Sequence, residues 1–348
     1  MSMKLFAAID IGSYEVEMKI FQITSGKGIK EIDCVCHRME LGKDVYRDGR
    51  IGVEMTDELC RVLNDFVRIM KGYRVDDWRV CATSAVREAG NQLVFLDRVK
   101  RHTGLEVEVL SNASQRFMDY KSIASRENEF NRIIQKGTAI VDVGGGSIQI
   151  SLFDKDRLVA SQNMKIGNLR LRERMMNEGV SLKHYETLLT EVVKNEFLSY
   201  KKLYLKDRVI SNLIVVGDHI GDAVHKNVMT RADFLNFYDD MIYRSDEDAA
   251  GRCEVPEDVI SVLRPSLVVY RCFLEAADVE NIWMPGLHLT DGMAYEYAQQ
   301  NRLLKLGHDF DEDILAAARN AAKRYQCSKS HIKVCEDLAV GIFDKIKK

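Results

Sequence analysis

Two segments of the chain repeat one design: an apolar strand, an aspartate, a turn rich in glycine, and a second strand. Residues 7–21 (AAIDIGSYEVEMKIF) and 139–153 (AIVDVGGGSIQISLF) align without a gap and place Asp10 over Asp142. The first arm of each segment is continuously apolar, as in a strand covered on both faces, whereas the second arm alternates, as in a half-covered hairpin strand. The repetition predicts an internal duplication in which each half contributes one turn to a shared cleft.

The two turns carry the groups that bind phosphate. Glycine leaves backbone N–H groups bare, and successive N–H groups form a nest that suits an anion. The predicted phosphate-binding residues of the turns are Gly12, Ser13, Gly144, Gly145, Gly146 and Ser147. Asp10 and Asp142 are the predicted metal ligands, because Mg²⁺ (or Mn²⁺ in its place) typically takes one or two carboxylates plus water. Either segment alone is equally compatible with an ordinary tight hairpin, and the second copy favours the phosphate site.

Composition sets the class of protein. The chain has 348 residues, 46% of them hydrophobic, which predicts about two domains with a sizeable core. The formal net charge is −3 and charges are interleaved, so we expect no face for duplex nucleic acid. Eight cysteines without CxxC spacing indicate a cytoplasmic protein with reduced thiols, and Cys34 with Cys36 is either a redox pair or one face of a strand. No segment approaches the roughly twenty apolar residues of a membrane span, and no apolar signal segment precedes Lys4, so we expect no membrane association.

Helical and strand patterns alternate along the chain, as in layered α/β domains. In the first half we expect strands at 29–36, 78–82 and 105–110, a polar turn at 42–52, and helices from Thr56 or Asp57 to about 70, at 91–103 and from about 113. In the second half we expect helices at 168–178, 181–204 and 257–277 and a strand at 213–217. These patterns predict two α/β domains, at 1–135 and 136–300, with the cleft between them, and a short helical hairpin at 301–348.

In combination, five motifs resemble the Ppx/GppA family of exopolyphosphatases and guanosine pentaphosphate phosphohydrolases, within the actin, Hsp70 and sugar-kinase superfamily. They are IDIGS (9–13), ATSAVREAGN (82–91), VDVGGGS (141–147), KIGNLRL (165–171) and PGLHLTDG (285–292). The resemblance covers nearly the whole chain. It implies two actin-like (ribonuclease H-like) domains with an interdomain cleft, and it makes the C-terminal hairpin the start of the family's helical domain. It also makes a homodimer reasonable.

The activity that the resemblance implies is metal-assisted hydrolysis of a terminal phosphoanhydride, in polyphosphate or a guanosine alarmone. Such a reaction needs neutralised charge, an aligned water and a group that takes the proton of that water. Asp142 would hold the cation or orient the water, with Asp10 assisting. Arg87 is predicted to clamp phosphate, because a guanidinium grips phosphate bidentately; an ion pair with Glu88 or a helix-end contact is the alternative.

The chain departs from the family where the proton acceptor is expected. Relatives carry a segment like SGxEEA, but residues 111–117 read SNASQRF, so Ser114 and Gln115 occupy the acidic positions. An amide holds water but does not take its proton near neutral pH, so a contribution of roughly 10²–10⁴-fold should be missing. Tyr14 and Glu15 follow the first turn, where Glu15 is either a displaced base or a carboxylate that faces solvent or repels an anionic substrate.

Three functions stay open on the sequence. The first is a slow exopolyphosphatase or (p)ppGpp phosphohydrolase with Asp142, Gln115 and Glu15 as catalytic candidates. The second is a catalytically impaired relative that binds polyphosphate or guanosine alarmone as a sensor or regulator. The third is an ATP-dependent kinase or actin-like ATPase, which the motif at 82–91 disfavours. A loop with Asp218, His219 and Asp222 is either a metal site or a solvated loop.

Overall fold

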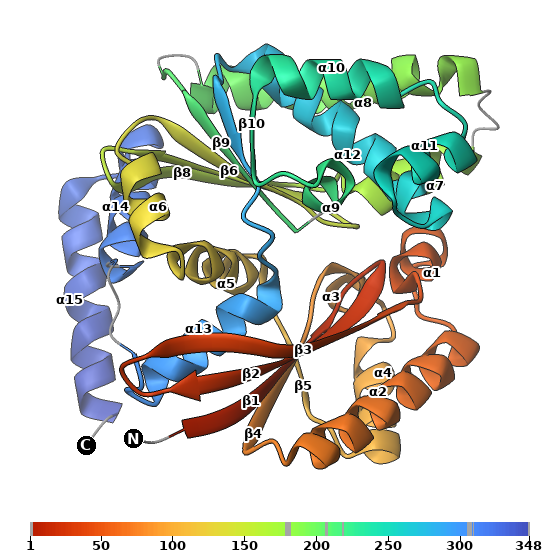
Figure 1. Cartoon of the computed structure of the whole chain (residues 1–348). Helices are drawn as coiled ribbons and strands as arrows, with labels where there is room; N and C mark the ends of the chain where they lie inside the picture. The colour runs from red at the N-terminus through yellow and green to blue at the C-terminus, as the bar shows by residue number, and fades with distance from the viewer. Residues whose placement is uncertain are drawn as a thin grey trace.

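The computed structural model describes residues 3–177, 182–205, 208–217, 219–304, 308 and 310–346. Two twisted sheets lie one above the other in Figure 1, each with helices packed against it. The first sheet is built from the N-terminal part of the chain and the second from the part that follows residue 137. This arrangement confirms the predicted α/β fold with two sheets.

The first sheet has five strands in the order β3-β2-β1-β4-β5. Their bounds are β1 (Met3–Ile11), β2 (Glu15–Thr24), β3 (Gly28–Arg38), β4 (Asp77–Ala82) and β5 (Val107–Val109). The first three strands pair antiparallel, and β4 and β5 continue the sheet in parallel with β1. Residues Phe6 to Ile9 of β1 are buried, with alternate side chains in two different clusters, because helices cover both faces of this strand.

The second sheet has six strands in the order β10-β11-β9-β6-β7-β8. Their bounds are β6 (Thr138–Val143), β7 (Ile148–Asp154), β8 (Arg157–Met164), β9 (Asn212–Val216), β10 (Val228–Thr230) and β11 (Asn281–Trp283). Here β6, β7 and β8 pair antiparallel, while β9 and β11 run parallel to β6. The central strand β6 is buried along its whole length.

The two sheets repeat the same plan, as the aligned segments predict. In each, an aspartate is the last residue but one of the central strand, and a hairpin leads into the second strand. The same bond closes both turns, from the N–H of Gly12 to the carbonyl of Glu15 and from the N–H of Gly144 to the carbonyl of Ser147, each at 3.0 Å. The internal duplication is therefore present in hydrogen bonds as well as in sequence.

Helices cover both faces of the first sheet. They are α1 (Leu41–Asp48), α2 (Val53–Tyr73), α3 (Ser84–Glu88), α4 (Gln92–Thr103), α5 (Asn112–Ala124) and, from much later in the chain, α13 (Leu289–Gln300). Helix α6 (Glu127–Ile133) packs instead on the second sheet, where Phe130 shares a cluster with Ile140 and Phe153. Helices α2 and α4 share one core with the inner residues of the sheet. On the other face Tyr297 of α13 stacks on Phe6, with ring centroids 4.2 Å apart. The predicted domain ranges stay predictions, although α13, inside the range 136–300, packs on the first sheet.

The second sheet is covered by helices from the middle of the chain. They are α7 (Asn168–Asn177), α8 (Leu182–Tyr200) with a π-helical turn at Lys201–Leu205, α9 (Ile220–Val224), α10 (Arg231–Met241), α11 (Asp246–Cys253) and α12 (Glu257–Ala276). Helix α12 is apolar on almost every side and is buried between α7, α8 and α11, so Pro265 in its interior is tolerated by packing. The predicted helix at 257–277 is confirmed.

The prediction of a polar turn at 42–52 is wrong, because most of this segment forms α1. Leu41 and Val45 lie four residues apart and are both buried, so one face of a short helix packs on the core despite the many charged residues. The helix ends at Gly49, whose φ of +72° suits glycine.

The predicted start of the next helix is also wrong by one turn. Helix α2 begins at Val53, with Gly52 at the N-cap, rather than at Thr56 or Asp57. The Thr56 hydroxyl donates to the Gly52 carbonyl at 2.7 Å, so it bonds back along the first turn from within the helix.

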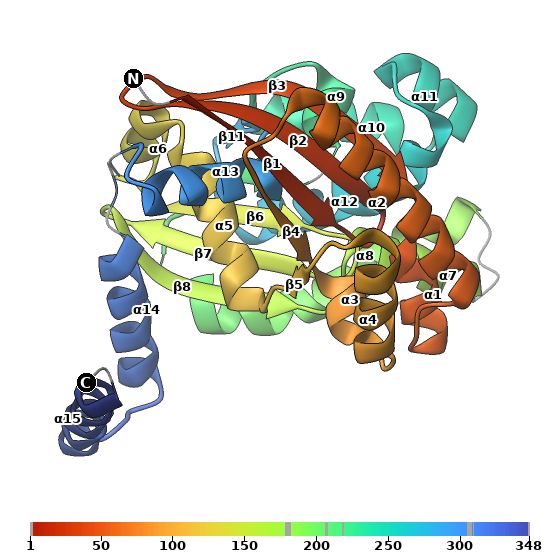
Figure 2. The ribbon, with the colours of Figure 1, turned by 90° about the horizontal axis from the view of Figure 1, so that it is seen from below.

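The chain ends in the predicted helical hairpin, α14 (Phe310–Arg324) and α15 (Lys329–Ile346). Helix α14 packs on β8, where Asp313 accepts bonds from the Leu158 N–H at 3.1 Å and from His308 at 2.6 Å. Helix α15 has no buried residue and stands clear of the body in Figures 1 and 2. Its large apolar side chains are exposed: Val334, Leu338, Val340, Ile342, Phe343 and Ile346. The homodimer stays a prediction.

No helix within the described residues combines the length and apolar character needed to cross a bilayer.

The two helices of the hairpin should differ in what they contribute to stability. We expect Asp313→Ala to lower the free energy of unfolding by about 1–3 kcal/mol, since it leaves a buried N–H unpaired. Ending the chain after Gln326, which removes α15, should change it by less than about 0.5 kcal/mol. Urea unfolding followed by circular dichroism measures both. A large loss on removal of α15 would contradict its lack of packing.

Candidate active site

One cavity lies where the two glycine turns meet, and both halves of the chain line it. The predicted site residues that line it are Asp10, Gly12, Ser13, Glu15, Gln115, Asp142, Gly144, Gly145 and Ser147. Two predicted residues, Arg87 and Gly146, do not line it. Aspartates from equivalent strands of the two sheets therefore face a common space, as the shared cleft requires.

The two turns approach so closely that side chains would not fit between them. A Cβ on Gly145 would lie 2.8 Å from the Cβ of Ser13, and a Cβ on Gly146 would lie 2.1 Å from the Tyr46 hydroxyl oxygen. Neither glycine has a positive φ. The absence of a side chain at Gly145 and at Gly146 is thus required by the opposite half of the molecule and not by the shape of the turn.

The Ser13 hydroxyl is already engaged on the side that faces this contact. It shares hydrogen bonds with the Tyr46 hydroxyl at 2.7 Å and with the Ser84 hydroxyl at 2.8 Å. Ser84 belongs to the motif at 82–91, and the Gly146 carbonyl accepts a bond from Arg170 at 2.9 Å. Glu88 of the same motif pairs with Arg170 at 2.9 Å, so the motif supports the second turn from the first half through this arginine. The phosphate-binding roles of Ser13 and Gly146 stay predictions.

Asp142 is buried and held by two side-chain amides. Gln149 donates to its Oδ2 at 3.3 Å and Gln115 donates to the same oxygen at 3.5 Å. Gly217, with φ of +78°, lies against the other oxygen, where a Cβ would come within 2.3 Å of Oδ1. The carboxylate is therefore fixed in orientation at the floor of the cavity.

Arg87 lies behind Gln115 and not in the cavity. Its Nη1 donates to the Leu110 carbonyl at 2.6 Å and to the Gln115 Oε1 at 3.4 Å. The alternative partner Glu88 pairs instead with Arg170 at 2.9 Å. The contact that Arg87 makes thus orients the glutamine amide, and its role as a phosphate clamp stays a prediction.

Three aspartates from different elements line the cavity: Asp10 of β1, Asp119 of α5 and Asp142 of β6. Burial, followed by the charges of Glu17 and Glu15, raises the pKa of Asp10 to about 8. Burial and the charges of the other two aspartates raise the pKa of Asp119 well above its ordinary value. Within the described residues, Oδ1 of Asp10 and Oδ2 of Asp119 are buried without a hydrogen-bond partner. The site therefore concentrates negative charge that its own residues leave uncompensated.

This charge pattern fits a divalent cation. No group of three or more His, Cys, Asp or Glu side chains in the described part of the chain is arranged to enclose a metal ion. Magnesium needs no such cage, because it usually takes one or two carboxylates and completes its shell with water and substrate phosphate. The unpartnered oxygen of Asp10 and the fixed carboxylate of Asp142 suit that mode of binding.

The second metal hypothesis concerned Asp218, His219 and Asp222. Asp218 lies outside the described residues. His219 Nδ1 lies 3.7 Å from the Asp222 carboxylate, and its Nε2 lies 3.9 Å from Glu15 across the cavity. Since Asp222 is largely exposed and His219 lines the cavity, the structure connects this histidine with Glu15 of the first turn.

Asp119, Glu17 and His288 are cavity residues that the sequence did not mark as candidates. Asp119 follows Gln115 by four residues on α5, so both side chains project from one face of the helix into the cavity. The signal was present in the sequence, because the helix predicted from about 113 includes both positions. Ser114, by contrast, is exposed, and it bonds Ser111 at the start of the helix through its hydroxyl at 2.8 Å and its N–H at 3.1 Å.

A partly buried ion pair brings one positive group to the cavity. His288 Nδ1 lies 2.7 Å from Glu17 Oε1, and Thr290 donates to the other oxygen of Glu17 at 2.5 Å. Burial alone would lower the pKa of His288, but the hydrogen bond and charge of Glu17 raise it to about 9. The same contacts outweigh burial at Glu17 and lower its pKa to about 2. His288 is thus an imidazolium at neutral pH.

Cys34 and Cys36 lie on the neighbouring strand β3 as free cysteines. Both lie on one face of β3, as the favoured interpretation predicts. Burial, with the charge of Glu17, raises the pKa of Cys34 to about 12, and burial with the charge of Glu15 raises the pKa of Cys36 further. Protonated thiols are poor nucleophiles, so these shifts favour the interpretation of one strand face over the redox pair.

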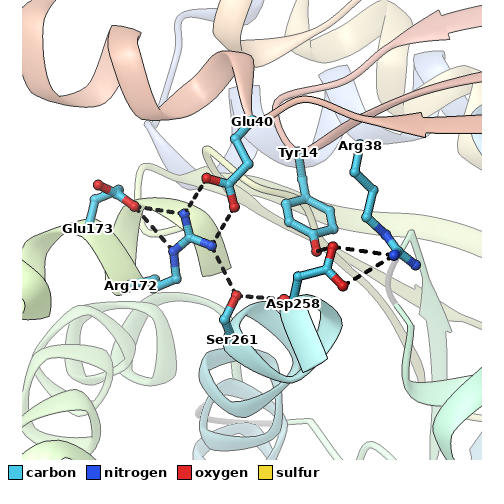
Figure 3. A network of polar contacts seen from close by, with 7 residues as sticks. All are labelled: Tyr14, Arg38, Glu40, Arg172, Glu173, Asp258 and Ser261. Carbon is cyan, nitrogen blue, oxygen red and sulfur yellow. Dashed lines mark hydrogen bonds and ion pairs between the residues drawn. The ribbon is translucent and has the colours of Figure 1, made fainter. Parts of the chain in front are cut away.

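Polar bridges join the two halves beside the cavity, as Figure 3 shows. Arg172 of α7 donates to both oxygens of Glu40, at 2.6 and 2.9 Å, and also pairs with Glu173 at 2.8 Å. The guanidinium and Glu173 are almost fully buried. This cluster therefore ties the first sheet's region to the second through charges that have little access to water.

A second bridge uses Tyr14, which follows the first glycine turn. Its hydroxyl donates to Asp258 of α12 at 3.3 Å, and Arg38 reaches the same carboxylate at 3.2 Å. The ring packs against Leu169 and Val262 of the second half, and Tyr14 and Val262 both line the cavity. Tyr14 thus forms part of a wall that closes one side of the cavity.

Comparison with known proteins agrees with this architecture. The sequence profile of the Ppx/GppA phosphatase family matches residues 19–301, so the chain belongs to this family. The crystal structure of the Aquifex aeolicus family member has a TM-score of 0.69 at 22% identity, covering 86% of this chain and 99% of that one. An exopolyphosphatase from Cytophaga hutchinsonii gives 0.74 at 17% identity, covering 87% and 100%. These likenesses confirm the predicted actin-like fold.

Curated relatives match this chain over a smaller share of their own length. Exopolyphosphatase 2 of Mycobacterium tuberculosis is 27% identical over 186 residues, 51% of this chain and 56% of the relative. The bifunctional 3-dehydroquinate synthase/phosphatase of Fusobacterium nucleatum is 26% identical over 180 residues, 49% of this chain and 26% of the relative. The guanosine-5'-triphosphate,3'-diphosphate pyrophosphatase of Photobacterium profundum is 20% identical over 352 residues, 98% of this chain and 67% of the relative. The chain thus spans only part of each of these relatives.

The ion pair of His288 should make stability depend on alkaline pH. A histidine whose pKa is raised on folding contributes stability that is fully present below its unfolded value near 6.5 and is lost as the pH rises through about 9. Because the imidazole is about a third exposed, we expect a contribution of about 1 kcal/mol. In melting curves from pH 6 to pH 9.5, the difference between the natural protein and His288→Gln should shrink with pH. A constant difference would contradict the pairing.

The two bridges should differ in strength. We expect Arg172→Leu to lower the free energy of unfolding by about 3–5 kcal/mol, because it leaves Glu173 buried without a partner. Arg38→Leu removes an exposed pair and should cost about 0–1 kcal/mol. Urea denaturation of both variants tests this contrast, and equal losses would show that the buried cluster does not hold the halves together.

Proposed function

We propose that this protein hydrolyses a terminal phosphoanhydride and releases orthophosphate from polyphosphate or a guanosine alarmone. The observation that carries the proposal is the shared cavity, in which Asp10 and Asp142 face each other beside two glycine turns. Relatives named as an exopolyphosphatase and as a guanosine-5'-triphosphate,3'-diphosphate pyrophosphatase support the substrate class.

The backbone of the two turns is suited to hold the phosphate. Gly12, Gly144, Gly145 and Ser147 line the cavity. The N–H groups of Gly12 and Gly144 close the turns themselves, so the phosphate would be held by the N–H groups that follow them and by the Ser147 hydroxyl. His288, paired with Glu17, also lines the cavity and carries a positive charge. Such donors stabilise the charge that develops on the transferred group because they are already oriented.

A divalent cation, Mg²⁺ or Mn²⁺, would be held by Asp10 and Asp142 and would neutralise phosphate oxygens when bound. Side chains of this protein keep the carboxylate of Asp142 in place. Gln115 and Gln149 do this through their amides, and Arg87 fixes the first of these amides in turn. Gln115 also lines the cavity, where its amide can position water without taking a proton.

The alternative function is a catalytically impaired homologue that binds the same anions as a sensor or regulator. The amide at Gln115 favours it, since the expected carboxylate is missing there. Polar bridges between the halves would give such a protein a way to respond to ligand through closure. A cytoplasmic location and a homodimer belong to either function as proposals.

Phosphate release separates these functions. We expect malachite-green assays with Mg²⁺ to detect orthophosphate from polyphosphate, pppGpp or both, and less from ATP. Asp142→Ala should lower the rate by about 10²–10³-fold, since it removes a charged group from the centre of the site. Chelation of the divalent cation should have a similar effect.

Binding is measured in parallel by thermal melting with polyphosphate or pppGpp present. Stabilisation without release would establish the sensor instead of the enzyme. Neither stabilisation nor release from any of these compounds would contradict both functions.

A further inference from the structure

We infer that Asp119 is the catalytic base, the group that takes the proton of the attacking water. The inference rests on the proposed hydrolysis and names the residue that supplies its missing step. Asp119 lies one helical turn after Gln115 on α5, and both side chains line the cavity. A carboxylate is therefore available in the site although residues 114 and 115 are not acidic.

The surroundings of Asp119 suit proton transfer. The residue is 5% exposed, and its Oδ2 is buried without a hydrogen-bond partner in the described structure. The charged groups that act on it are Asp142 from β6, Asp10 from β1 and Arg116 from its own helix. Burial and the two aspartates raise its pKa, which makes it a stronger base than an ordinary carboxylate.

Other carboxylates of the cavity are less suited to this task. Glu17 is paired with His288 through one oxygen and accepts a bond from Thr290 through the other, and its pKa is lowered to about 2. Glu15 lies beside His219 at 3.9 Å and is partly exposed to solvent. Once the two predicted cation ligands are set aside, Asp119 is the buried carboxylate that keeps an oxygen unpartnered.

The proposed step balances without any further reactant. An O–H bond of water breaks and its proton passes to Asp119, while the water oxygen forms a bond to the terminal phosphorus. The bridging P–O bond then breaks, and the leaving phosphate takes the electron pair. The proton on Asp119 returns to solvent or to the leaving group, which restores the carboxylate.

The test uses the full chain with Asp119→Asn, which keeps the shape and removes the basic oxygen. We expect kcat for phosphate release to fall by about 10²–10⁴-fold. The melting temperature should stay the same or rise, since a repelled buried charge is removed. The Mg²⁺ concentration for half activation should change by less than about threefold, because the base is not a cation ligand.

Rescue distinguishes a base from a structural residue. In the Asp119→Asn background, Gln115→Glu restores a carboxylate one turn earlier in the same cavity. We expect it to raise kcat for phosphate release by about tenfold or more over Asp119→Asn alone. Ser114→Glu is the matched control, since it adds the same charge to the same helix on its exposed side. It should recover nothing, and in the natural background it should leave the rate unchanged.

Three other outcomes would overturn the inference, each for a different reason. If the natural protein releases phosphate and Asp119→Asn matches it, Asp119 is not the base, and the proposed function stands. A rate that recovers at high Mg²⁺ would make Asp119 a cation ligand instead. No release by the natural protein would remove both the hydrolase and its base. Should Asp119→Asn fail to fold, Asp119→Ser with and without Gln115→Glu gives the same comparison.

Discussion

The structure depends on one contact that only glycine permits, where the turn of the second half lies against the turn of the first. Gly145 meets Ser13 and Gly146 meets Tyr46 at distances that leave no room for a Cβ. A side chain there would force the halves apart, since interiors are close-packed and adjust poorly. With the turns in contact, the aspartates at the ends of the two central strands line one cavity. Duplication of a simple hairpin thus yields a two-sided site.

That contact also explains the electrostatics of the site. Closing the turns buries Asp119 and Asp142 and brings them close to Asp10, and carboxylates so placed repel one another. Such an arrangement costs stability unless a cation or a proton offsets it, which is a common property of functional sites. Stability is recovered at the edges, where Arg172 joins the halves and His288 pairs with Glu17. The cavity is therefore poised for a ligand that brings positive charge with it.

Much of this could be predicted from sequence because the relevant signals are local. The two strand, aspartate and glycine segments, the buried helix at 257–277 and the terminal hairpin all follow from periodicity and turn chemistry. What could not be predicted depends on contacts between distant residues. Helix α1 is stabilised by a core that the charged sequence at 42–52 does not reveal. Arg87 donates hydrogen bonds to the Leu110 carbonyl and to Gln115, and both partners lie more than twenty residues away in the sequence. The four-residue spacing from Gln115 could have pointed to Asp119 in the sequence. That its side chain is buried follows only from the packed fold.

The most direct test of the central claim is a crystal structure with Mg²⁺ and imidodiphosphate, a phosphoanhydride analogue whose bridging nitrogen resists hydrolysis. The account predicts a phosphoryl group on the main-chain N–H groups of both turns, with the cation against Asp10 and Asp142. An anion bound elsewhere, or held by one turn while the other stays remote from it, would contradict the account.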